Sequence, residues 1–240
     1  TGDAIRAIAP QLEIDVLPYP VAAGMERNAA PPEPAQNPFT VLVVFNMASG
    51  FERKNPLAAI EAFNQAFGAD PTARLIIKML NAASNVVGAD RLRRLAASNA
   101  SIVIDERRLS PAEMSVMYAQ AHVVLSLHRS EGFGLVIAEG MLAGRPVIAT
   151  DWSGSIDFIG PETGMPVPYR LVPAIDPDGE YHRPNSVWAD ADTAEAAKGL
   201  RALRDDAELR RRLGEAARCQ ALEHFAPERY ASALLKRVLR

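Results

Sequence analysis

The sequence has a single cysteine, Cys219, among its 240 residues. An internal disulfide is therefore excluded, and a reducing, cytoplasmic environment fits this cysteine usage. No apolar run approaches the roughly 20 residues that span a bilayer, and no signal-peptide pattern is present. The formal net charge is only −3, so no global basic field indicates nucleic acid as a partner.

Motifs for two common kinds of cofactor are also missing. No group of His, Cys, Asp and Glu has the spacing of a metal site. Asp190 and Asp192 come nearest, but they directly precede an alanine-rich helical pattern and are interpreted as a helix cap. No Gly-x-Gly-x-x-Gly follows the first strand of the predicted sheet, which argues against a nicotinamide-dependent enzyme. We therefore expect neither a metal nor another cofactor.

What is present is the composition of a folded globular protein, with 48% hydrophobic and 23% charged residues. The length suits one large domain or two small ones. The chain starts at Thr1 without a methionine, and we expect it to be a fragment cut from a longer protein near a domain boundary.

Strand-like and helix-like patterns alternate from residue 39 to residue 150. The predicted strands cover residues 39–45, 74–79, 101–104, 122–127 and 147–150, and the predicted helices begin at Pro56, span 90–98 and 111–120, and follow Gly134. The segment from Ser110 to Glu113 has the pattern of a capping box. This alternation predicts an α/β fold, with a parallel sheet that has helices on both faces.

The flanking segments are less regular. We expect a helix at 1–9, a strand at 12–17, a proline-rich loop at 31–38, a loop-rich region at 160–190, and helices at 192–204, 206–224 and 227–239. The chain thus divides into a linker at 1–38 with a strand and the proline-rich loop, a main domain at 39–225, and a C-terminal helix at 226–240.

The most informative segment, residues 131–139, reads Glu-Gly-Phe-Gly-Leu-Val-Ile-Ala-Glu. A glycine turn at the carboxyl end of a parallel strand is where open α/β sheets bind ligands, and the following helix directs free N–H groups and its positive dipole end at that place. Glu139 has mostly apolar neighbours, where a charge is costly unless it is paired or faces a site. The segment could offer amides to a phosphate and carboxylates to hydroxyls. A structural turn and an exposed helix face are the alternatives.

Two cations follow the first strand at the same edge of the sheet. Arg53 and Lys54 precede the helix at Pro56, and such a pair could neutralise a diphosphate. A solvated basic pair is the alternative. A second basic run, at residues 210–212, lies among acidic residues and is interpreted as a solvated helix face, with peripheral binding to an anionic membrane as the alternative.

Three further candidates border the glutamate segment. His128 and Arg129 precede Glu131 and lie at the carboxyl rim of their strand. Ser153 follows the strand at 147–150 in a second turn of small residues. A structural role is the alternative for His128, and helix capping is the alternative for Ser153.

This sequence resembles the retaining glycosyltransferases of family 4, whose C-terminal domain carries a Glu-x7-Glu signature. The residues that carry the resemblance are Ser130-Glu-Gly-Phe-Gly-Leu135, Glu139, Met141, Gly144 and Pro146-Val-Ile148. The resemblance implies a GT-B fold, in which two Rossmann-like domains enclose a cleft, the N-terminal one binding the acceptor and the C-terminal one the nucleotide-sugar donor. This chain resembles the C-terminal, donor-binding half, with a doubly wound Rossmann-like sheet.

Site roles follow from the resemblance by position. Glu131 would bind hydroxyls of the donor sugar near the reacting carbon, and Glu139 would accept hydrogen bonds from the ribose. Lys54, helped by Arg53, would stabilise the leaving diphosphate. The amides that would hold sugar and phosphate are those of Gly132, Phe133, Gly134 and Leu135. His128, Arg129 and Ser153 are added to this donor-binding set because they lie at the same rim.

One departure concerns the phosphate contacts. Many family members have a Gly-Arg pair just after the first strand, whereas residues 46–50 here read Asn-Met-Ala-Ser-Gly. We expect Arg53 or Arg129 to replace the missing arginine.

The resemblance also implies a reaction and partners. A sugar would pass from a nucleotide-diphospho-sugar, with retention, to a glycan or lipid-linked acceptor, in bacterial surface polysaccharide synthesis in the cytoplasm or at the inner face of the plasma membrane. The acceptor domain is missing, so we expect the chain by itself to have little or no transferase activity. A non-catalytic nucleotide-sugar-binding module and a GT-B-like epimerase or phosphorylase are the alternatives.

Overall fold

The computed structural model describes residues 2–17, 19–21, 34–35, 38–177, 179, 181 and 183–239. Its main part is a parallel sheet of six strands in the order β3-β2-β1-β4-β5-β6. The strands are β1 (Phe39–Asn46), β2 (Ala73–Leu80), β3 (Ile102–Asp105), β4 (Val123–Ser126), β5 (Val147–Thr150) and β6 (Met165–Val167). The order reverses between β1 and β4, and ligands of open α/β sheets bind at the carboxyl ends of strands at such a switch point.

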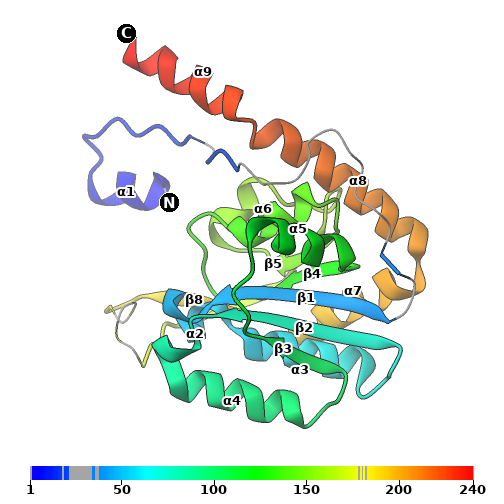
Figure 1. The fold of residues 1–240 in the computed structure, drawn as a ribbon. Coiled ribbons are helices and arrows are strands. Elements are labelled where there is room, and N and C mark those ends of the chain that lie inside the picture. Colours follow the sequence, from blue (N-terminus) through cyan, green and yellow to red (C-terminus); the bar gives the residue numbers. More distant parts are fainter. Residues whose placement is uncertain are drawn as a thin grey trace.

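Helices cover both faces of this sheet (Figure 1). One face packs against α3 (Pro56–Phe67), α4 (Val86–Ala97) and α7 (Thr193–Asp205), and the other against α5 (Pro111–Gln120), α6 (Leu135–Leu142) and α8 (Ala207–His224). The predicted α/β fold, a doubly wound Rossmann-like parallel sheet, is confirmed.

Short elements connect and flank this core. They are α1 (Gly2–Ile8), η1 (Met47–Ser49), α2 (Phe51–Lys54), η2 (Ala82–Asn85), η3 (Ser153–Asp157), a hairpin of β7 (Tyr169–Pro173) and β8 (Val187–Ala191), and α9 (Pro227–Val238). Among the helices that the structure describes, none is long and apolar enough to cross a membrane.

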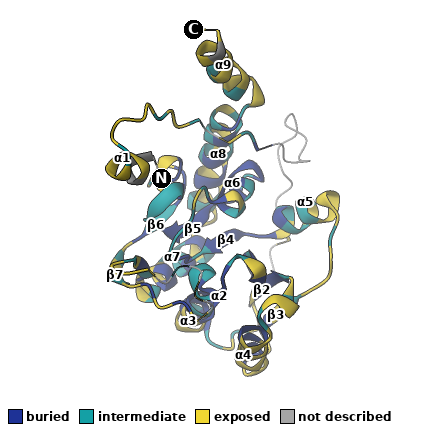
Figure 2. Cartoon of the chain, turned by 90° about the vertical axis from the view of Figure 1, so that its left-hand side faces the viewer, coloured by how far each residue is buried: buried dark blue, intermediate teal, exposed yellow. Residues whose placement is uncertain are grey.

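Alternation of side chains along β1 builds two separate cores. Val41 and Val43 face one side of the sheet and belong to the same buried cluster as Phe63 of α3. Leu42 faces the other side and belongs to the cluster that contains Ile137 of α6. Because both faces are covered, the strand is a continuous apolar run, as is usual in parallel sheets. Figure 2 shows the buried residues concentrated in the sheet and the exposed ones on the outer helices.

Two helix starts have the predicted caps. The Ser110 hydroxyl accepts from the N–H of Glu113, and the Glu113 carboxylate accepts from the N–H of Ser110, which completes the capping box of α5. The Asp192 carboxylate accepts the N–H groups of the first turn of α7. The interpretation of Asp192 as a cap is therefore confirmed.

One prediction at the flanks is wrong, and another is incomplete. The expected strand at 12–17 is not formed, because no neighbouring strand pairs with it among the described residues, and Leu12 and Val16 stay exposed. The region 160–190 is loop-rich, as expected, but it also contains β6, β7 and most of β8, which were not predicted. Prolines 166 and 173 are compatible with these strands because they lie in an edge strand and at a strand end. Most of the proline-rich segment 31–38 lies outside the described residues.

Candidate functional site

A cleft of about 730 Å³ lies at the carboxyl ends of β1 and β4. This volume is typical of small-molecule sites. Its walls come from the end of β1, from α2, from α5 and from the start of α6. The predicted site residues that line the cleft are Arg53, Lys54, Glu131, Phe133, Gly134, Leu135 and Glu139. The fold thus brings most of the sequence candidates together at the switch point of the sheet.

The loop that carries Glu131 is held against the turn after β5. The N–H of Glu131 donates to the Ser153 hydroxyl at 2.8 Å, and the N–H of Gly154 donates to the carbonyl of Glu131 at 3.0 Å. A Cβ atom on Gly154 would lie 2.3 Å from the carbonyl oxygen of Gly132, so only glycine permits this approach. Gly134, with φ of 97°, ends the loop in a left-handed conformation and starts α6.

Ser153 and Gly132 do not line the cleft. Ser153 is not a helix cap: it begins η3, makes no cap hydrogen bond, and instead fixes the backbone of Glu131. Gly132 faces the turn that contains Gly154. Both residues shape the loop that carries Glu131 and Phe133, which do line the cleft.

His128 is fully buried under the same loop. Its Nε2 lies 3.2 Å from the Ser155 hydroxyl, and its Nδ1 has no hydrogen-bond partner among the described residues. Burial lowers the pKa of His128 to about 4, so the imidazole is neutral at pH 7. The structure gives His128 a place in the support of the loop and not in the lining of the cleft.

Glu131 and Lys54 form a close ion pair at the charged end of the cleft. Arg53 adds a second cation, with its Nη1 at 3.4 Å from the Glu131 carboxylate. Burial opposes ionisation of Glu131, but Lys54 and then Arg53 hold the pKa of this carboxyl below its usual value. The carboxylate is therefore charged at neutral pH and close to two cations.

The backbone after β1 explains the position of these cations. Lys54 is the last residue of α2, and Asn55 ends this helix in a left-handed conformation with φ of 51°. The buried Asn55 amide donates to the carbonyl of Leu127 at 3.0 Å, and the N–H of Arg129 donates to the carbonyl of Arg53 at 2.8 Å. These bonds tie α2 to the end of β4, so Lys54 and Glu131 meet although they are 77 positions apart.

Glu139 lies on α6, at the other side of the cleft. Its carboxylate accepts a hydrogen bond of 2.7 Å from the Tyr118 hydroxyl. Burial raises the pKa of Glu139, and the bond from Tyr118 opposes this shift. Sequence reasoning missed Tyr118, a fully buried residue of α5 that also lines the cleft. No signal along α5 distinguishes it from an ordinary core tyrosine.

Arg129 points away from this cleft. It pairs with Glu52 at 2.9 Å and with Asp190 at 3.8 Å, and its guanidinium lies 5.8 Å from the ring centre of Trp188. Arg129, Glu52 and Asp190 border a second cavity of about 650 Å³, lined by both acidic and basic side chains. Of the two arginines expected to replace the missing one after β1, only Arg53 reaches the cleft.

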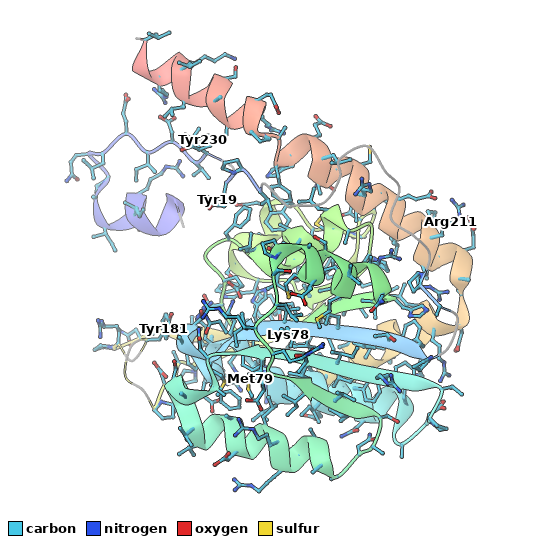
Figure 3. The ribbon with its side chains drawn as sticks, in the orientation of Figure 1. Tyr19, Lys78, Met79, Tyr181, Arg211 and Tyr230 are labelled. Atoms are coloured by element: carbon cyan, nitrogen blue, oxygen red, sulfur yellow. The ribbon has the colours of Figure 1, made fainter. Side chains whose placement is uncertain are left out.

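Arg53 itself is held in several directions. Its guanidinium donates to the carbonyls of Ser49 and Ser130, at 2.7 Å each. It also lies 5.5 Å from the ring centre of Tyr181, in the loop between β7 and β8 (Figure 3). The cation is thus preorganised at the cleft, next to the ring of Tyr181.

The arrangement has a defined chemical capacity. Two cations and a carboxylate at one end suit a diphosphate and sugar hydroxyls, and a second carboxylate beside Tyr118 can accept hydrogen bonds from a diol. Within the described residues, no three His, Cys, Asp or Glu side chains come together as a metal site.

Structural neighbours share this fold. A mutant of TarM from S. aureus, solved with fondaparinux, alpha-GlcNAc-glycerol and UDP, superimposes with a TM-score of 0.68 at 16% identity over 98% of this chain and 42% of its own. A glycosyltransferase from Rickettsia africae superimposes with a TM-score of 0.65 at 20% identity, over 85% of this chain and 47% of its own. HepE from Anabaena, solved with UDP and glucose, superimposes with a TM-score of 0.62 at 18% identity, over 84% of this chain and 48% of its own. The chain spans less than half the length of each.

A comparison with curated proteins gave no match. A family model, described as "Family 4 Glycosyltransferase in conflict systems", matches residues 4–222. This match covers most of the sequence and includes the whole cleft. The chain therefore belongs to the family 4 glycosyltransferases of conflict systems.

Proposed function

We propose that this chain is the donor-binding part of a retaining glycosyltransferase that uses a nucleotide-diphospho-sugar. The observation that carries the proposal is the meeting of Lys54, Arg53 and Glu131 at one end of the cleft, with Glu139 at its other side. In a nucleotide-diphospho-sugar the sugar hydroxyls, the diphosphate and the ribose hydroxyls follow one another. Glu131 suits the sugar, the two cations suit the diphosphate, and Glu139 suits the ribose.

The charged end of the cleft receives the reacting part of the donor. Lys54 leaves its contact with Glu131 and binds phosphate oxygens, while the carboxylate accepts hydrogen bonds from sugar hydroxyls. As the bond between sugar and phosphate breaks, the diphosphate gains negative charge, and preorganised cations stabilise that charge in the transition state. Lys54 and Arg53 provide these cations, and the N-terminus of α6 adds the N–H groups of Gly134 and Leu135.

The apolar end of the cleft receives the nucleoside. It is lined by Leu80, Leu109, Pro111, Met114 and Ser115. Glu139 is bonded to Tyr118 of α5 beside this wall, where it can accept hydrogen bonds from both ribose hydroxyls. HepE and the pneumococcal transferase GtfA were solved with UDP, which makes UDP-sugars the first donors to test.

The acceptor belongs to another part of the enzyme. Because the chain spans less than half of its structural neighbours, we place a glycan or lipid-linked acceptor on an N-terminal domain outside this chain. The donor-binding part alone then has little or no transferase activity. We place the enzyme in bacterial surface polysaccharide synthesis, in the cytoplasm or at the inner face of the plasma membrane.

Calorimetric titration of the chain with UDP-, GDP- and ADP-sugars tests the proposal. We expect one nucleotide class to bind, and Glu139→Ala to weaken that binding by about tenfold to a hundredfold, since hydrogen bonds to a charged group are lost. Absence of binding by all three classes would refute the donor-binding role.

The chemistry is tested with the protein that contains the acceptor domain. Release of free nucleotide diphosphate with transfer of the sugar supports a transferase. Binding without turnover favours a non-catalytic module, and interconversion of the sugar without an acceptor favours an epimerase. A demand for inorganic phosphate or pyrophosphate favours a phosphorylase.

A further inference from the structure

Lys78 is a lysine buried inside the protein, and its position has no use in the donor chemistry proposed above. It lies on β2, and its side chain is fully inaccessible. Its register partner on β1 is Val44, and Ile76 precedes it on the same face of β2. A buried ammonium group is costly unless hydrogen bonds and an opposite charge compensate it.

The compensation comes from one short segment of the chain. The Nζ atom of Lys78 lies 3.3 Å from the carboxylate and 3.3 Å from the carbonyl of Asp105, and it also donates to the carbonyl of Arg107. An ammonium group has three protons, and these three oxygens satisfy them. All three belong to the exit of β3, which leads to α5.

Asp105 is fixed from its other side as well. Its carboxylate accepts from the backbone N–H of Arg107 at 2.9 Å and from the Arg107 guanidinium at 2.6 Å. Arg107 and then Lys78 lower the pKa of Asp105 to about 2, so the carboxylate stays charged. The ion pair therefore anchors the backbone of residues 105–107 to the sheet.

This anchor precedes the apolar wall of the cleft. Leu109 and Pro111 follow within a few residues, and Met114, Ser115 and Tyr118 continue the wall along α5. Tyr118 holds the far end of this helix through its bond to Glu139. Figure 3 shows Lys78 in the sheet beside the segment that joins β3 to α5.

An ion pair is not required for stability at such a place. Replacement of a buried pair by apolar residues is often neutral or stabilising, and Ile76 and Val44 show that this face of the sheet accepts apolar side chains. What an apolar residue cannot supply is a directional hold on the carbonyls of Asp105 and Arg107. The ammonium group thus fixes where the segment after β3 runs.

We propose that Lys78 is a positioning residue for the nucleoside end of the donor cleft: its bonds to Asp105 and Arg107 set the wall from Leu109 to Tyr118. The inference rests on the proposed function, because it assigns the nucleoside to this wall. Lys78 does not line the cleft, so its effect on the ligand passes through the segment that it holds.

The test is Lys78→Met, which keeps the length of the side chain and leaves Asp105 paired with Arg107. Calorimetry with UDP, GDP and ADP measures affinity and nucleoside selectivity. We expect the affinity for the preferred nucleotide to fall by about tenfold, as for a misplaced binding wall, and the preference among the three to shrink. Hydrogen exchange of the amides of 106–115 should become faster, while exchange in β1 and β4 stays unchanged.

The matched control is Glu106→Gln. Glu106 is in the same segment, but its ion pair with Arg93 is exposed and it does not line the cleft. This variant should keep the affinity, the selectivity and the exchange rates of the unchanged protein.

Three outcomes decide the inference. A folded Lys78→Met protein with unchanged selectivity and unchanged exchange in 106–115 overturns it. If Lys78→Met does not fold, the same assays are made with Asp105→Asn, which removes the charge partner of Lys78. Failure of both variants to fold assigns Lys78 a purely structural role. If the unchanged protein binds no nucleotide, the proposed function fails, whereas faster exchange in Lys78→Met would still show that Lys78 positions the segment.

Discussion

Replacing Lys54 by methionine removes the main cation beside Glu131 and leaves a largely buried carboxylate. The side chains of the pair are only 16% and 11% exposed, so solvent replaces little of the lost interaction. Removal of one partner of a fully buried pair costs roughly 3–5 kcal/mol. Arg53 remains 3.4 Å from the carboxylate, which reduces the loss. We expect Lys54→Met to lower the free energy of unfolding by about 2 kcal/mol at pH 7.

The pH dependence of this loss has a definite sign. In the unchanged protein the pKa of Glu131 is below its usual value. Ionisation of Glu131 therefore stabilises the folded protein at any pH above the pKa that this residue has in the unfolded chain. This stabilisation is lost as the pH falls through the lower pKa of the folded protein. In Lys54→Met, burial becomes the dominant influence and raises the pKa of Glu131 above its usual value. Protonation of Glu131 then removes the unpaired buried charge in the variant. The difference in unfolding free energy between the unchanged protein and Lys54→Met should therefore shrink as the pH falls from about 7 to about 4.

Urea denaturation of both proteins across this pH range measures the effect. At pH 7 the expected loss corresponds to a fall in Tm of about 4–8 °C for a domain of this size. Lys198→Met is the control, because Lys198 forms an exposed pair with Glu195, and such pairs contribute roughly 0–1 kcal/mol. A deficit of Lys54→Met that stays constant with pH, or that is no larger than the control's, would refute this reasoning.

Two further predictions concern the supports of the cleft. Tyr118→Phe removes the only hydrogen bond that the Glu139 carboxylate accepts from the residues that the structure describes. The unfolding free energy should fall by about 1.5–3 kcal/mol at pH 7, and an NMR titration should show a higher pKa for Glu139. An unchanged pKa would contradict the assigned bond. Gly154→Ala places a methyl group against the carbonyl of Gly132. We expect chemical denaturation to show a fall in unfolding free energy of about 1–3 kcal/mol, together with weaker nucleotide-sugar binding. A variant of normal stability and affinity would contradict the close approach.

The sequence predicted five of the six strands of the central sheet, because the inner strands β1, β4 and β5 are buried on both faces. The edge strand β6 was not predicted. The continuous apolar runs of β1 and β4 and the capping box of α5 are local signals that agree with the final fold. The hairpin of β7 and β8 was not predicted, because it is partly exposed and prolines flank its strands. The alternating pattern at 12–17 predicted a strand that does not form, since a strand also needs a partner, and no local pattern reports one.

The candidate site was predicted in part. Glu131, Lys54 and Arg53 follow strands whose carboxyl ends meet at one edge, so topology brings them together. Arg129 is two residues from Glu131, and in a regular strand the two side chains would point to the same side. The chain bends at Arg129, and its side chain faces the other cavity. Tyr118 was not predicted because its role depends on the packing of α5 against α6.

A crystal structure of this chain with UDP tests the central claim most directly. We expect the base against Leu109 and Met114, the ribose hydroxyls within hydrogen-bond distance of the Glu139 carboxylate, and the outer phosphate beside Lys54. UDP bound instead in the cavity around Arg129, or in the cleft with its phosphates at the apolar wall of α5, would contradict it.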